Sequence, residues 1–239
     1  MEEPNRFLTA QWSNLVMLNY AVDPALLAPF VPSGTELDSF DGETWLSLVG
    51  FEFNRTRLHG IRVPFHQSFE EVNLRFYVRR GGKRGVVFIR ELVPKRAVAA
   101  VARMAFGENY SHAPMSHRME RRADGALVAE YAWGRGPRRC AMQIETEEDA
   151  FLPADGSASQ FITEHYWGYA AQSGGGCVEY EVKHPRWLVR TAKHAAFTGN
   201  PADVYGAGLA KILSRKPDSA FLAEGSEVIV MKGARISPL

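Results

Sequence analysis

The sequence predicts a mainly β (α+β) fold in which a closed or nearly closed sheet carries a few packed helices. Its apolar residues come mostly in short runs, and 21 glycines and 13 prolines are scattered between them. Aromatic residues, which favour strands, make up 11% of the chain. Many short strands interrupted by few helices favour a sheet that closes on itself, and a closed sheet offers an interior pocket.

The order of the elements follows from turn and cap signals. Asp23 supplies an N-cap side chain and Pro24 suits a first helical turn, so a short helix is expected after the first strand. Asp41 and Gly42 can take the positive φ angles of a tight turn, which predicts a hairpin. The expected helices are 24–30, 94–106, 157–165 and 201–213. The expected strands are 14–22, 35–40, 44–53, 68–80, 86–92, 111–121, 127–133, 139–146, 177–182, 187–191 and 228–232.

Composition excludes several classes of protein. The chain has 239 residues, with 28 Lys and Arg against 27 Asp and Glu, and no linker or repeat divides it, so we expect one domain over residues 1–239. A net charge of +1 without a basic face argues against nucleic-acid binding. No apolar run reaches the roughly 20 residues of a membrane span, and the residues MEEPNRF lack the basic and apolar regions expected of a signal peptide. We therefore expect a cytoplasmic protein without a membrane partner.

Metal and cofactor motifs are not found in the sequence. His112 and His117 are five residues apart and would face opposite ways on a strand. Cys140 and Cys177 lack the spacing of a zinc or redox motif. The glycines of SGGGC lack the strand, turn and helix setting of a phosphate loop. The sequence thus predicts neither a metal site nor a cofactor.

Polar residues recur on one face of the expected strand 68–80. Glu71, Asn73 and Arg75 alternate with apolar residues, so all three share a face. In a barrel, half of a strand's side chains enter the interior, where these three would line a pocket. The alternative is that this face looks outward to water, because charged residues are rarely buried unpaired. Alternation alone leaves both readings open.

Lys95 is a second candidate. It lies in the first turn of the expected helix, where the positive helix end and the neighbouring Arg96 both disfavour another positive charge. An amine held neutral in this way attacks a carbonyl to form a Schiff base. The alternative is a solvated lysine at a helix end, which is the commoner situation.

Four stretches of the chain resemble a known family: NLVMLNYAVDPALLAPFVPSGTELD, LVGFEF, FEEVNLRFYV and, above all, IRELVPKRAV. They are similar to the acetoacetate decarboxylase-like superfamily and, within it, to the YqjF-like family, a domain of unknown function. The resemblance extends from about Arg6 to Met231. It implies an acetoacetate decarboxylase-like, partly open β-barrel, and the superfamily's homo-oligomers imply possible self-association.

The resemblance also implies roles for individual residues. Acetoacetate decarboxylase has REL followed closely by PKK, and here Lys95 falls on the Schiff-base lysine and Arg96 on the cation that activates it. Glu52 and Glu71 match the acidic pocket residues, Glu70 being a less secure match. The decarboxylase arginine near the first strand has no counterpart in this chain.

The remaining predicted pocket residues bind rather than react. In place of the missing decarboxylase arginine, Arg75 is a candidate for gripping a carboxylate through two parallel hydrogen bonds. Asn73 is a second polar anchor beside it. His165, within the family-like run TEHYWGY, borders the predicted pocket.

Three functions follow from this interpretation. The first is an enzyme without a cofactor that acts on a small keto or aldehyde compound through a Lys95 Schiff base, with Glu71 and Glu52 orienting the substrate or moving protons. In this function, Lys95 and Glu71 face each other in a dry chamber. The second is a barrel that binds a small molecule without covalent chemistry. The third is a scaffold, which leaves the polar strand unexplained.

Overall fold

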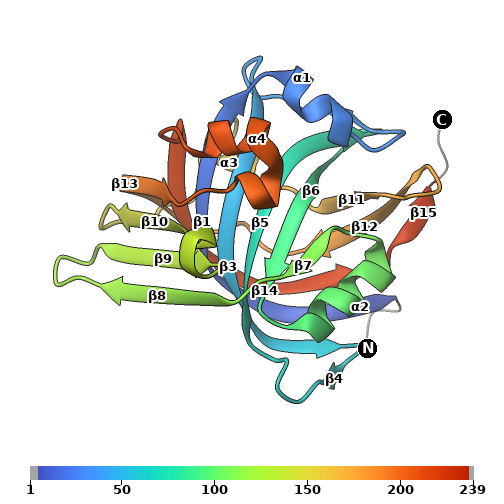
Figure 1. Cartoon of the computed structure of the whole chain (residues 1–239), viewed down its shortest axis with the longest axis horizontal. Helices are drawn as coiled ribbons and strands as arrows, with labels where there is room; N and C mark the ends of the chain where they lie inside the picture. The colour runs from blue at the N-terminus through green and yellow to red at the C-terminus, as the bar shows by residue number, and fades with distance from the viewer. Residues whose placement is uncertain (1–4, 237–239) are drawn as a thin grey trace.

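The computed structural model describes residues 5–236, which contain fifteen strands and four α-helices (Figure 1). The strands are β1 (Arg6–Val22), β2 (Glu36–Leu37), β3 (Thr44–Leu58), β4 (Ile61–Arg62), β5 (Phe69–Arg80), β6 (Lys83–Val93), β7 (Tyr110–His112), β8 (Met115–Arg121), β9 (Leu127–Trp133), β10 (Cys140–Thr146), β11 (Trp167–Ala171), β12 (Cys177–Lys183), β13 (Val189–Thr198), β14 (Ser219–Met231) and β15 (Ala234–Ile236). The α-helices are α1 (Pro24–Leu27), α2 (Arg96–Phe106), α3 (Ala158–Thr163) and α4 (Ala202–Leu213). Two 3₁₀ turns, η1 (Ala28–Phe30) and η2 (Gly136–Arg138), complete the structure.

A subset of the strands closes into a barrel. The pairings run β1, β3, β5, β6, β11, β12, β14 and back to β1, and these strands are called the ring below. Two closures are short: β6 meets β11 at Gly85 and Val86, and β12 meets β14 at Val182 and Lys183. The ring is therefore a barrel held together on one side by brief pairings, as expected of a partly open barrel.

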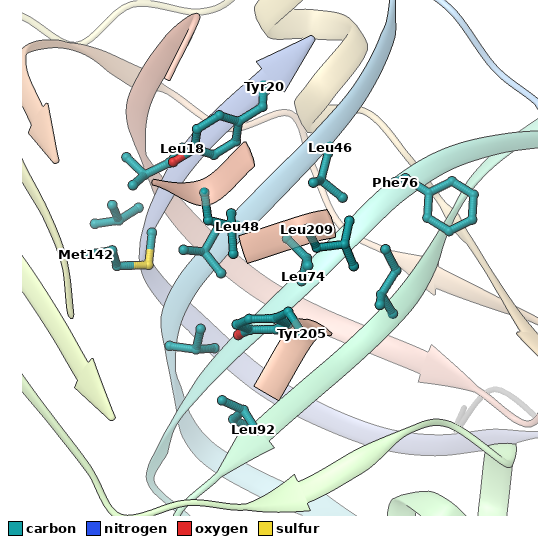
Figure 2. Close-up of a cluster of buried hydrophobic side chains, with 14 of the residues drawn as sticks. Leu18, Tyr20, Leu46, Leu48, Leu74, Phe76, Leu92, Met142, Tyr205 and Leu209 are labelled. Atoms are coloured by element: carbon teal, nitrogen blue, oxygen red, sulfur yellow. The ribbon is translucent and has the colours of Figure 1, made fainter. Parts of the chain in front are cut away.

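Outside the ring, the sheet continues from β14 through β13, β10, β9 and β8. This arm and α4 cover one flank of the ring, and a core of buried apolar side chains fills the space between them (Figures 1 and 2). Figure 2 shows Leu48 and Leu74 from the ring beside Leu209 of α4 and Met142 of β10. We call this cluster the flank core.

The two faces of β5 enter different surroundings. Leu74 and Phe76 point into the flank core, while the intervening residues point into the ring. A bulge at Ile89 interrupts the pairing of β5 with β6, so that Glu91 pairs with Asn73 and Phe88 with Arg75. Both β6 side chains consequently share the ring interior with their β5 partners.

The four predicted helices are confirmed, and two of their caps form as expected. Asp23 accepts a hydrogen bond from the Ala25 amide at 2.8 Å, and Ser157 accepts one from the Gln160 amide at 3.2 Å. The Asp41 and Gly42 turn also forms, with positive φ at both residues.

Several strand predictions need correction. β2 pairs with β5 rather than across the Asp41 turn with β3. The expected strand 111–121 is divided at Ala113 and Pro114, because proline lacks the amide that a sheet ladder needs. β11 was not predicted from the sequence.

The mainly β fold is confirmed, while the single domain over residues 1–239 stays a prediction whose ends lie outside the described residues. Among residues 5–236, none of the helices has the length and apolar character needed to cross a bilayer.

Candidate functional site

The ring encloses a cavity of about 210 Å³. Every ring strand contributes to its wall, and α2 covers it with Ala97, Val98 and Val101. Most lining side chains are apolar or aromatic, among them Trp12, Phe51, Phe53, Phe88 and Trp187. Pockets for drug-sized ligands measure roughly 300–1,000 Å³. This cavity is smaller, and its volume suits a molecule of a few non-hydrogen atoms.

A polar strip crosses this apolar chamber along β5. Glu71 and Asn73 are each 2% exposed and Arg75 is 8% exposed, and all three line the cavity. Asn73 Nδ2 donates to Glu71 Oε1 at 3.0 Å, and the Tyr110 hydroxyl donates to Glu71 Oε2, also at 3.0 Å. Both oxygens of Glu71 are thus held by donors, which fixes the orientation of the carboxyl group.

Two further carboxyl groups lie at the same end of the cavity. Glu91 comes from β6 and Glu108 from the connection between α2 and β7, and both are buried. The Tyr180 hydroxyl of β12 donates to Glu108. We call Glu71, Glu91 and Glu108 the acidic cluster.

Burial shifts the protonation of the whole acidic cluster. Burial raises the pKa of Glu71 to about 7, although hydrogen bonds from Asn73 and Tyr110 and the charge of Arg75 lower it. Burial likewise raises the pKa of Glu108 to about 8. For Glu91, burial and the charges of Glu108 and Glu71 raise the pKa well above its ordinary value. The cluster therefore holds protons that it can give up near neutral pH.

The other polar end of the cavity is basic. The Arg75 guanidinium donates to the Ile162 carbonyl at 3.3 Å and to Met17 Sδ at 3.9 Å. Among the residues that the structure describes, no carboxylate lies within ion-pair distance of Arg75, and its Nε has no hydrogen-bond partner. This buried guanidinium is therefore left without a counterion in its first contact layer.

His165 lies beside this arginine. It is stacked on Tyr77 with ring centroids 4.5 Å apart, and Arg84 Nη2 lies 3.3 Å from its Nε2. Burial and the charges of Arg84 and Arg75 lower the pKa of His165 well below its ordinary value, so the ring is neutral. An imidazole that accepts from Arg84 at Nε2 carries its proton on Nδ1, and that atom has no partner within the described chain.

The structure brings Glu71, Asn73, Arg75 and His165 together but leaves Lys95 and Arg96 apart from them. Lys95 is the half-buried N-cap residue of α2, and Arg96 is exposed. Neither belongs to the cavity lining among the described residues, although Ala97 does. The expected meeting of Lys95 and Glu71 inside the chamber is thus not seen.

Glu52 and Glu70 also lie elsewhere. They are register partners on β3 and β5, next to Phe51 and Glu71, whose side chains enter the ring. Side chains alternate along a strand, so Glu52 and Glu70 point to the opposite face. There His117 of β8 bridges them, at 3.3 Å from Glu52 and 2.9 Å from Glu70.

Sequence reasoning missed Glu91, Glu108, Tyr110, Tyr180 and His184 as cavity residues. Glu91 stood in the run IREL, where an acidic residue inside an apolar strand is a signal that was available. The inward direction of its side chain depends on the bulge at Ile89, which no local pattern indicated. Within residues 5–236, no three His, Cys, Asp or Glu side chains are grouped so as to hold a metal ion.

Comparison with known proteins identifies the family to which the chain belongs. The model of the family DUF2071, described as an uncharacterized conserved protein, matches residues 9–227. The chain belongs to the DUF2071 family. The uncharacterized protein YqjF of Bacillus subtilis (strain 168) is 27% identical to this DUF2071 protein over 203 residues, which cover 82% of the chain and 80% of the relative.

Solved structures share the fold. An acetoacetate decarboxylase-like enzyme from Sphingomonas wittichii RW1 superimposes with a TM-score of 0.70 at 12% identity, covering 98% of this chain and 94% of the other. The enduracididine biosynthesis enzyme MppR in complex with pyruvate gives a TM-score of 0.71 at 14% identity, covering 100% of this chain and 93% of the other. This DUF2071 protein therefore has the acetoacetate decarboxylase-like fold.

Proposed function

We propose that this DUF2071 protein is an enzyme that acts on a small keto or aldehyde compound bearing an acidic group. One observation carries the proposal: a buried arginine without a carboxylate partner and a carboxyl group with a pKa of about 7 share an otherwise mainly apolar cavity. Such a combination of perturbed titratable groups in a cleft is typical of active sites. It accounts for the polar strip that a scaffold would leave unexplained.

Arg75 is the group that would bind the substrate's acidic end. A buried charge is costly unless it is paired, so an entering carboxylate removes a penalty that the empty cavity bears. The unpartnered Nε is one of the donors that a guanidinium presents to a carboxylate in a two-point contact.

Glu71 is the group that would move a proton. A general acid or base works best when its pKa lies near the working pH, and Glu71 meets this condition near neutrality. Asn73 and Tyr110 hold its two oxygens, so the carboxyl group needs no reorientation before it reacts.

Lys95 is the proposed nucleophile. Its amine would attack the substrate carbonyl, and loss of water would leave an iminium that draws electrons from the adjacent carbon. Its position two residues before Ala97, the first α2 residue in the cavity wall, supports this role. The side chain would have to turn toward the cavity when the substrate binds.

A second candidate function is binding without covalent chemistry. The separation of Lys95 from the cavity wall favours it, since within the described chain this side chain makes no hydrogen bond or ion pair with the acidic cluster. In that case Arg75 and Asn73 anchor the ligand, and the aromatic walls enclose it.

Borohydride trapping separates the two candidates. The full chain is incubated with pyruvate or acetoacetate and reduced, and the adduct is located by peptide mass spectrometry. The proposal predicts a mass increase on Lys95 that is lost in Lys95→Arg and kept in Lys211→Arg, which alters an exposed lysine of α4. Binding of pyruvate without any adduct contradicts the Schiff base and supports the second candidate.

A further inference from the structure

Resting on the proposed function, which makes this cavity the substrate site, we infer that its ligand carries a protonated nitrogen group, such as an ammonium or a guanidinium. Glu91 and Asn73 bind that group at the acidic end, while Arg75 lies at the other end. The inference narrows the substrate class from a small keto or aldehyde compound bearing an acidic group to one that also carries a cationic nitrogen.

Two acceptor atoms are open at the acidic end. Asn73 Oδ1 and Glu91 Oε2 have no hydrogen-bond partner in the described part of the chain, and their residues are 2% and 1% exposed. The two residues are register partners on β5 and β6, which places their Cβ atoms about 4.5–5.5 Å apart on the cavity face. A single donor group can therefore reach both.

The donors at this end are already in use. The Tyr110 hydroxyl donates to Glu71, the Tyr180 hydroxyl donates to Glu108, and Asn73 Nδ2 donates to Glu71. Apart from the protons that the carboxyl groups themselves carry, no free donor is left at this end for an acceptor on the ligand. The open donors, Arg75 Nε and His165 Nδ1, belong to the basic end instead.

The charges around Glu91 also favour a cationic group on the ligand. The titratable or charged groups facing Glu91 are Glu71 and Arg75 on β5, Glu108 before β7, Tyr110 on β7 and Tyr180 on β12. Three buried carboxyl groups thus face one buried guanidinium. Burial keeps protons on this cluster when no ligand is bound, and a cationic nitrogen would take the place of those protons.

The cavity walls between the acidic end and the basic end indicate the chemistry of the middle part of the ligand. They are formed by side chains such as Phe51, Phe88 and Val98, which offer no polar partner. A short hydrocarbon segment that carries the nitrogen group therefore fits the middle of the cavity.

Calorimetric titration with three small probes of similar shape tests the inference. n-Butylammonium, 1-butanol and n-butyrate are titrated into the full chain between pH 6 and pH 9. We expect n-butylammonium to bind most tightly at high pH and to release protons from the acidic cluster when it binds. Where one proton is released, its affinity should fall about tenfold for each unit by which the pH is lowered. Binding of 1-butanol as tight as that of n-butylammonium throughout this range, or an n-butylammonium affinity that does not change with pH, would overturn the inference; n-butyrate reports on the Arg75 end.

A variant locates the site. Glu91→Gln should weaken n-butylammonium binding at least about 30-fold, as expected when one partner of a buried charge pair is lost, and should weaken the binding of the uncharged 1-butanol far less. Glu70→Gln is the matched control, because Glu70 lies on the opposite face of β5. Unchanged n-butylammonium binding in a folded Glu91→Gln variant would overturn the assignment.

The outcome is separate from that of the proposed function. An adduct on Lys95 together with n-butylammonium binding no tighter than that of 1-butanol leaves the carbonyl chemistry standing and removes this inference. A preference for n-butylammonium without any adduct keeps the ligand class and removes the Schiff base.

Discussion

The two faces of β5 are equally buried but have opposite chemistry. On one face, Leu74 and Phe76 pack in the flank core beside α4 (Figure 2). On the other, Glu71, Asn73 and Arg75 line a cavity with several polar atoms that lack partners. A buried polar group without a partner is costly, so the second face reduces stability in a way that the first does not. The flank core therefore stabilises the fold, whereas the polar residues of the ring interior carry the function proposed above.

The largest expected effect comes from the flank core. Phe76→Ala should lower the free energy of unfolding by about 3–5 kcal/mol, because a fully buried aromatic ring is replaced by a void. Guanidinium denaturation at constant pH measures this loss. A loss below about 1 kcal/mol would show that this face is less tightly packed than the comparison requires.

The titration of Glu71 predicts a pH effect of slightly smaller size. The folded-state pKa of Glu71, about 7, lies above its ordinary value of 4.5. The folded protein therefore binds this proton more tightly than the unfolded chain, and stability falls as pH rises from about 5 to about 8. For Glu71 the loss is on the order of 3 kcal/mol.

Glu71→Gln should make this part of the pH profile less steep, since the substituted side chain does not titrate while Glu108 and Glu91 still do. Urea unfolding of both proteins from pH 5 to pH 8.5 makes the comparison. A wild-type stability that rises steadily over this range would contradict the burial of the cluster.

Arg75 gives an effect of opposite sign. Arg75→Met replaces a buried guanidinium that lacks a counterion by an apolar chain of similar length, so the free energy of unfolding should rise by about 1 kcal/mol. Thermal and chemical unfolding measure the change. A decrease of several kcal/mol in the free energy of unfolding would show that Arg75 stabilises the fold, which would contradict a role in ligand binding alone.

The smallest effect is expected outside both interiors. Glu52 is half-buried and pairs with His117, whose side chain is 35% exposed. Glu52→Gln should change stability by about 1 kcal/mol or less, because the pair is partly open to solvent and glutamine can still hydrogen-bond to His117. Ligand binding should be unchanged, and its loss would place Glu52 in the site after all.

The sequence predicted the sides of β5 better than the contents of the ring. Period-two alternation showed that Glu71, Asn73 and Arg75 share a face, but it did not show whether that face points into the barrel or to solvent. That depends on how the barrel closes. That closure depends on pairings between segments far apart in the chain, which local patterns do not encode.

The same limit explains the residues that were misplaced or missed. Glu52 was matched to the pocket by family resemblance, yet strand alternation turns it away from the ring beside Phe51. Glu91 was overlooked because only the bulge at Ile89 directs it inward. Glu108 and Tyr180 meet only when β12 and the chain after α2 come together, so no spacing in the sequence joined them.

The most direct test compares neighbouring residues on the two faces of β5. Pyruvate binding is measured by calorimetry for Arg75→Met and Phe76→Leu, each confirmed to be folded at the temperature used. We predict that Arg75→Met abolishes binding and that Phe76→Leu keeps it within about twofold, since a conservative core change costs stability rather than shape at the site. Equal binding by the two variants, whether both bind or neither does, would contradict the division of β5 into a structural face and a ligand face.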